Sequence, residues 1–98
     1  MKRIALNGKE YPCRVTMGAM VRFKRESGHD AGQMKSGDTS DLVLFLWCCV
    51  ASACSADGVE FPYDFMGFAD AITPGMLDDF YKEESVVNEK KTVDQTKQ

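Results

Sequence analysis

Apolar and polar positions are distributed unevenly along the chain, and residues 42–56 stand out because they carry no charge. Read as a helix over about 41–56, this stretch is apolar on all sides, so it has to be covered all round. A membrane-spanning helix needs about 20 apolar residues, and this stretch is bounded by Asp41 and Asp57. We therefore expect either a buried core helix or a surface that holds another chain, and no membrane association.

The first residues alternate between apolar and polar, which predicts a β-hairpin over about 3–15. Asn7-Gly8 favours a two-residue type I′ turn, because both positions tolerate positive φ. That turn pairs Leu6 with Lys9 and Ile4 with Tyr11. A two-stranded ribbon is marginal alone in water, so its apolar face is expected to pack on helices. The face comprises Ile4, Leu6, Tyr11, Cys13 and Val15.

Three further apolar stripes have helical spacing and predict shorter helices at about 17–27, 62–72 and 74–83. Thr16 is a suitable N-cap for the first of these helices, and Gly28 fits the position just beyond its end.

The other helix boundaries also carry start signals. Ser40 or Thr39 is expected to cap the central helix, and Pro62 suits the first turn of the third. Thr73-Pro74 has the cap-then-proline order of a helix start.

These elements predict an α+β fold, mainly α, in which an N-terminal hairpin packs on a small bundle of about four helices. We expect one compact domain over residues 1–84. Residues 29–39 are polar and contain glycines, which indicates a mobile loop. Beyond Glu84 the apolar pattern fails, so residues 85–98 are expected to form a disordered, flexible tail.

Charge and cysteine content restrict the function classes. A net charge of -3 argues against nucleic acid, because phosphate binding needs a concentrated basic face. The basic start is not followed by the apolar run of a secretory signal, so we expect a cytoplasmic protein with reduced thiols. The four cysteines show no Cys-x-x-Cys pair and lie far in sequence from His29, which predicts no metal site. They are Cys13, Cys48, Cys49 and Cys54.

Candidate catalytic residues are few. His29-Asp30 has no activated nucleophile to complete it, and the adjacent Asp78 and Asp79 suit the start of a helix better than paired acid–base chemistry. We therefore expect a protein that is not an enzyme and that needs no cofactor.

The order of elements resembles a known family. The resemblance is carried by the residues at 4–11 (IALNGKEY), 16–28 (TMGAMVRFKRESG), 41–49 (DLVLFLWCC) and the helical segment 65–80. Over residues 3 to 82 the chain is similar to the tail assembly chaperones of long-tailed bacteriophages and prophages, which are small cytoplasmic proteins with a β-hairpin ahead of a helical body.

This resemblance implies a function in the bacterial host cytoplasm. Such chaperones bind the tape measure protein, a long, helical, hydrophobic chain, and keep it soluble until tail tube subunits polymerise around it. The family also implies a longer product, made by ribosomal frameshifting, whose extension recruits the tail tube protein. Lys90-Lys91 is compatible with an A-rich slippery codon run in the gene.

Methionine-rich and aromatic helices suit such a partner, because methionine side chains adapt to varied surfaces. Each of these side chains could equally fill the core. The residues that we expect to contact the partner are Met17, Met20, Phe23, Phe65, Phe68 and Tyr81.

Other functions stay open at this point. The chain could be a small structural tail or connector subunit whose apolar surfaces form a homo-oligomeric ring, or an adaptor of an unrelated kind. A third alternative is a small enzyme or metal-binding module built on His29, Asp30 and the cysteines.

Overall fold

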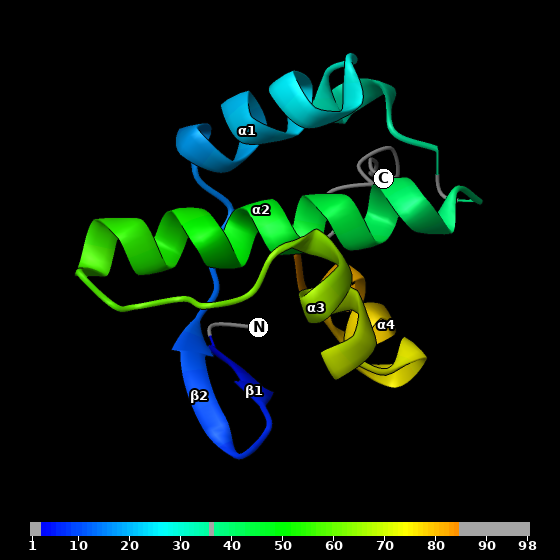
Figure 1. Cartoon of the computed structure of the whole chain (residues 1–98). Coiled ribbons are helices and arrows are strands. Elements are labelled where there is room, and N and C mark those ends of the chain that lie inside the picture. Colours follow the sequence, from blue (N-terminus) through cyan, green and yellow to red (C-terminus); the bar gives the residue numbers. More distant parts are fainter. Residues whose placement is uncertain (1–2, 36, 85–98) are drawn as a thin grey trace.

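The computed structural model describes residues 3–35 and 37–84, and it confirms the predicted α+β, mainly helical fold. In chain order the elements are β1 (Arg3–Leu6), β2 (Lys9–Pro12), α1 (Met17–Ser27), a short 3-10 helix η1 (Ala31–Gln33), α2 (Thr39–Asp57), α3 (Phe65–Ala71) and α4 (Pro74–Glu84). Figure 1 shows α2 in the middle, with α1 on one side and the hairpin, α3 and α4 on the other. The predicted tail at 85–98 lies outside the described residues.

The hairpin has the predicted turn and register. Asn7 and Gly8 have φ of 52° and 84°, and the antiparallel pairs include Ile4 with Tyr11 and Leu6 with Lys9. Pairing ends at Pro12, three residues earlier than predicted, because proline has no amide N–H to donate. Ile4, Leu6 and Tyr11 are all buried and turn the apolar face of the hairpin towards α2.

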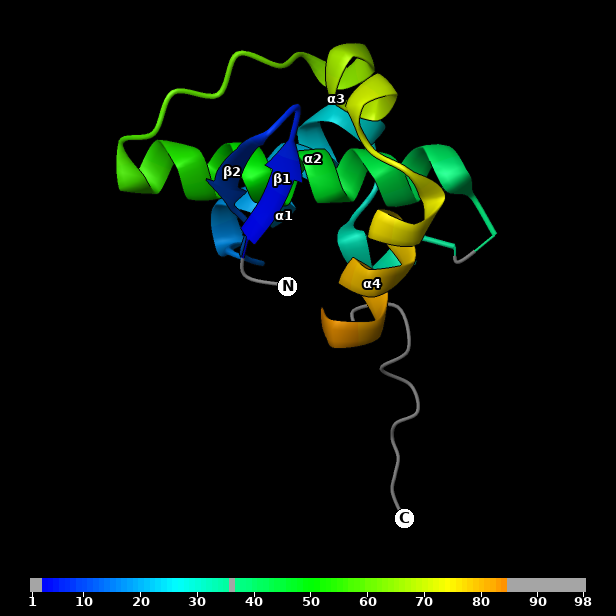
Figure 2. The same ribbon diagram turned by 90° about the horizontal axis from the view of Figure 1, so that it is seen from below.

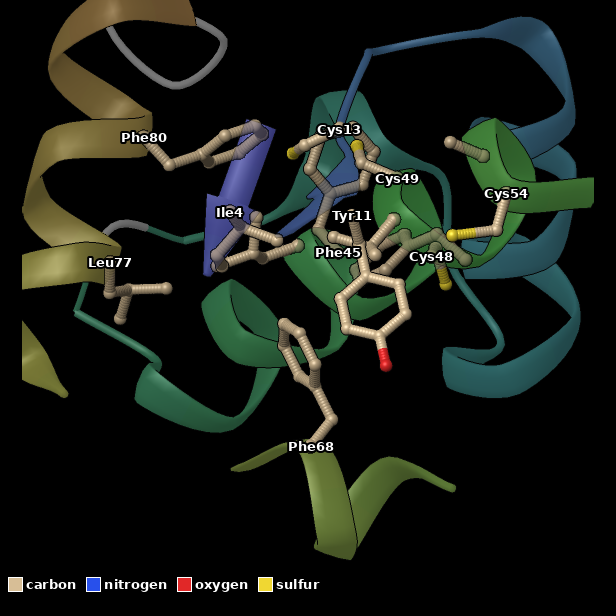
Figure 3. Close-up of a cluster of buried hydrophobic side chains, with 14 of the residues drawn as sticks. Ile4, Tyr11, Cys13, Phe45, Cys48, Cys49, Cys54, Phe68, Leu77 and Phe80 are labelled. Carbon is tan, nitrogen blue, oxygen red and sulfur yellow. The ribbon is translucent and has the colours of Figure 1, made fainter. Parts of the chain in front are cut away.

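The core is built around α2, which α1, α3, α4 and β2 all contact. Phe45 of α2 lies edge-to-face against Phe23 of α1, with ring centroids 5.6 Å apart. On the other side Phe45 approaches Phe80 of α4, and Phe68 of α3 is fully buried in the same cluster. Figure 2 shows the hairpin, α3 and α4 arranged along α2, and Figure 3 shows Phe45, Phe68 and Phe80 entering one cluster from separate elements.

Two predicted helix starts were wrong, because aspartate side chains cap the helices at other positions. Asp38 accepts a hydrogen bond from the backbone N–H of Asp41, so α2 begins at Thr39 and neither Ser40 nor Thr39 is its cap. Asp64 accepts one from the N–H of Gly67 at 2.7 Å, so α3 begins at Phe65 and not at 62. In contrast, Thr16 and Gly28 take the predicted places at the two ends of α1.

The segment predicted as a mobile loop, 29–39, is held to the core at two points. It contains η1, and Met34, which follows η1, is 8% exposed and belongs to the core. His29 Nε2 lies 2.6 Å from Asp41 Oδ2, which links the end of α1 to the first turn of α2. Neither contact could be predicted from the sequence, because both depend on residues brought together only by the fold.

A second link joins the exit of the hairpin to the far end of α2. The guanidinium of Arg14 donates two hydrogen bonds to the carboxylate of Asp57, at 3.0 and 2.9 Å. These bonds lower the pKa of Asp57 below its usual range. Because both side chains are more than a third exposed, we expect this pair to fix the orientation of α2 rather than to add much stability.

Helices α1 and α2 approach closely where Gly18 faces Ser52. A methyl carbon on Gly18 would lie 3.3 Å from Ser52 Oγ, which is tighter than most such contacts. Among the described residues, Ser52 Oγ is a buried polar atom with no hydrogen-bond partner. Gly18 therefore leaves space for the hydroxyl of Ser52, which is buried there without forming a hydrogen bond.

We predict that substitutions at these two positions are coupled. Ser52→Ala should not lower the free energy of unfolding, because the hydroxyl lost has no partner. Gly18→Ala should stabilise the Ser52→Ala variant by about 1 kcal/mol through helix propensity, and should stabilise the wild type clearly less. Chemical denaturation of the wild type, the two single variants and the double variant gives the coupling energy between the two positions. Additive effects within about 0.3 kcal/mol would contradict the close contact.

Candidate partner-binding surface

Among residues 3–35 and 37–83, three large apolar side chains lie mostly in solvent, and they define two patches on different helices. Met17 and Val21 are 73% and 51% exposed on α1, and Met66 is 61% exposed on α3. We call Met17, Val21 and the half-buried Met20 the α1 patch. The α3 patch comprises Met66 and Phe65 of α3 together with Trp47 of α2. Phe65 and Trp47 are half-buried.

The α1 patch points away from the core because of the orientation of α1. Ala19 and Phe23 are fully buried against α2, and positions four apart on a helix share a face. Met17 and Val21 are exposed and also four apart, so they form one stripe on the opposite side of α1. The charged residues of α1 are mostly basic: Arg22, Lys24 and Arg25 are basic, and Glu26 is acidic.

The α3 patch is held rigidly by contacts between α2, α3 and the segment that joins them. Trp47 Nε1 donates a hydrogen bond to the backbone carbonyl of Tyr63 at 3.1 Å. The Trp47 ring meets Phe65 edge-on, with centroids 6.3 Å apart, and Met66 follows directly on the exposed side of α3. The exposed carboxylates of Asp64 and Asp70 flank this patch on the same helix.

The six side chains predicted to contact a partner fall into two groups. Met17, Met20 and Phe65 retain accessible surface and belong to the two patches. Phe23 and Phe68 are 0% exposed, so in the folded protein they belong to the core and cannot contact another chain.

Tyr81 is the intermediate case among these six. Its hydroxyl donates to the backbone carbonyl of Leu42 at 2.7 Å, and its ring packs on Phe80. Burial raises the pKa of the phenol. The residue therefore anchors α4 to α2, although part of its surface stays accessible.

Sequence reasoning missed Val21, Trp47 and Met66. Val21 was not among the expected contacts, although its spacing of four from Met17 places both on one face whichever way that face points. The apolar surroundings of Trp47 and Met66 gave no indication of their exposure.

The other chemically notable residues serve the fold. The four cysteines are buried thiols, and burial raises the pKa of Cys48 to about 12 and that of Cys54 above its usual value. The hydroxyl of Ser27 lies 2.7 Å from the backbone carbonyl oxygen of Phe23 and 3.0 Å from that of His29. Within residues 3–35 and 37–84, no group of three His, Cys, Asp or Glu side chains is placed to hold a metal ion.

Helix α2 is long and apolar enough to cross a membrane by length and composition, and 44% of its most apolar window is buried inside the protein. Core helices of soluble proteins meet the same criterion, so this property does not identify a membrane segment.

Comparison of the chain with protein families, curated proteins and solved structures finds no match.

We predict that the native thiols are protected from modification. With the Ellman reagent at pH 8, all four cysteines should react at least about a hundredfold more slowly in the folded protein than in denaturant, because reaction requires opening of the core. A Ser55→Cys variant is the control, since Ser55 is exposed near the end of the same helix. Its added thiol should react fast. A wild-type cysteine that reacts equally fast would contradict the described core.

Proposed function

We propose that this protein is a tail assembly chaperone of a long-tailed phage or prophage, which binds the helical, hydrophobic tape measure protein and keeps it soluble during tail assembly. The observation that best supports the proposal is the exposure of Met17, Val21 and Met66 on two well-packed helices. Large apolar side chains exposed together mark surfaces that bind other chains. The resemblance of the sequence to such chaperones supports the same function.

The two patches suit a helical client for a physical reason. An amphipathic helix places an apolar residue on one face at every third or fourth position, and it is held by complementary apolar side chains. Met17 and Met66 are unbranched and polarisable, so they can follow an irregular apolar surface. The half-buried rings of Phe65 and Trp47 add flat apolar area beside Met66 at little cost in conformational entropy.

Other parts of the proposal rest on the resemblance alone. These are the bacterial cytoplasm as the place of action, and recruitment of the tail tube protein by a longer, frameshifted product. A tail or connector subunit that forms a ring is the second candidate, because the two patches lie on opposite sides of α2 and could meet between copies.

The test is co-expression with the long helical protein encoded just downstream. That protein should be insoluble alone and soluble when bound to the chaperone in a pull-down. Met17→Asp and Met66→Asp should each reduce the retained partner at least about tenfold, because docking would bury an unpaired carboxylate.

The structure supplies a matched control for this experiment. Met17 and Met66 both lie in the first turn of their helices, where the dipole favours a negative charge, so neither substitution should unfold the protein. Thr39→Asp places the same charge in the exposed first turn of α2, away from both patches, and should retain the partner. A partner that is soluble alone, or equal retention by all variants, would contradict the proposal.

A further inference from the structure

The outer face of α1 changes in character along the helix, from apolar to basic. Met17 and Val21 are exposed, and Lys24 and Arg25 occupy the last turn, where both are also exposed. Positions three, four, seven and eight apart share one face of a helix, so all four side chains lie on the same side of α1. This side is opposite the buried Ala19, and it joins an apolar half to a basic half.

The acidic residue of α1, Glu26, lies away from this outer face. Burial is the main cause of the raised pKa of the Cys48 thiol of α2, and the charges of Glu26 and Arg22 act on the same pKa. Glu26 and Arg22 are therefore close to α2, and they offset each other there. The outer face of α1 keeps a net positive charge at its carboxyl-terminal end.

Part of this positive charge has no partner within the protein. Lys24 Nζ lies 3.4 Å from Asp30 Oδ1, and both side chains are more than half exposed, so this pair is weak. Among the described residues, Arg25 has neither an ion pair nor a hydrogen bond through its side chain. A free guanidinium can bind a carboxylate with two parallel hydrogen bonds.

We infer that the outer face of α1 binds a helix of another protein that begins with acidic residues and continues as an apolar stripe. Apolar positions of that helix, spaced by three or four residues, would pack on Met17 and Val21. A carboxylate in its first turn would pair with Arg25. The inference specifies the helix that the proposed function requires, and it rests on that function for the protein that carries the helix.

The charges also set the direction in which the partner helix lies. Carboxylates are favoured in the first turn of a helix, because the dipole is positive there. Antiparallel docking places this first turn against the last turn of α1, where Arg25 lies, and the following turns against Val21 and Met17. With a rise of 1.5 Å per residue, Met17 and Arg25 are about 12 Å apart along the axis, so the contact takes about three turns of the partner.

A partner helix fits this face better than an anionic membrane surface does. Basic amphipathic helices can lie on membranes, but they do so by burying a broad apolar face in lipid. The buried face of α1, with Ala19 and Phe23, is packed on α2 and is not available to lipid. The exposed Met17 and Val21 form a narrow stripe, which matches the stripe of one amphipathic helix.

The test measures binding of the whole protein to labelled helical peptides of about 20 residues by fluorescence anisotropy. The first peptide has two glutamates ahead of a leucine stripe, the second has lysines in place of the glutamates, and the third has the glutamates after the stripe. The first should bind at least about tenfold more tightly than the second, and also more tightly than the third. Its advantage over the second should shrink at high salt.

Variants assign the preference to the outer face of α1. Arg25→Glu should reverse the preference between the glutamate and lysine peptides. Lys82→Glu is the matched control, because it makes the same change of charge in the last turn of α4, which Figure 1 shows on the other side of α2. It should bind like the wild type, and so should Met66→Asp. Met17→Asp should weaken binding of every peptide, and circular dichroism should show that each variant is folded.

Several results would overturn the inference. These are equal binding of the glutamate and lysine peptides, an unchanged preference in Arg25→Glu, or a preference that Lys82→Glu alters as much as Arg25→Glu does. Binding of phosphatidylserine vesicles by a protein that binds none of the peptides would also overturn it. A protein that solubilises its partner in co-expression but shows no preference among the peptides would keep the proposed function and lose this inference.

Discussion

The structure depends on the requirement that α2 be covered on every side. Residues 42–56 of this helix carry no charge, so the stretch cannot be left in water, and no single neighbour can shield its whole circumference. The chain meets this requirement with four separate elements: α1 on one side, the hairpin on another, and α3 and α4 on the remainder. Their aromatic side chains, including Phe23, Phe68 and Phe80, converge on the same core cluster.

The same requirement explains why apolar surface remains outside. A chain of 98 residues supplies only one layer of elements around α2, and a small protein buries a limited part of its surface. Within the part of the chain that the structure describes, helices α1 and α3 thus have no layer behind them, and Met17, Val21 and Met66 lie on their uncovered sides. Under the proposed function, these side chains are covered by another chain.

Features governed by local chemistry could be predicted from the sequence. The positive φ of Asn7 and Gly8 fixed the turn and register of the hairpin, and Thr16 and Gly28 marked the ends of α1. The orientation of a helix about its own axis depends on distant partners and was much harder to predict. This is why Phe23 and Phe68 were expected to contact a partner, while the structure buries both in the core.

Loop structure was misjudged for the same reason. The polar composition of 29–39 indicated mobility, but Met34 and His29 find partners in the core and on α2. At the start of α3, Pro62 signalled a first turn, yet the stronger cap of Asp64 set the boundary three residues later. A local signal thus failed wherever a tertiary contact or a better cap was available nearby.

Native-state hydrogen exchange, measured residue by residue, is the most direct test that α2 is the enclosed centre of the fold. We predict that the amides of 45–54 exchange only by global unfolding, with opening free energies equal to the free energy of unfolding from denaturation. Amides in the outer helices α1 and α3 should have lower opening free energies. If the amides of α2 exchanged by local opening more readily than those of α1, the central claim would be wrong.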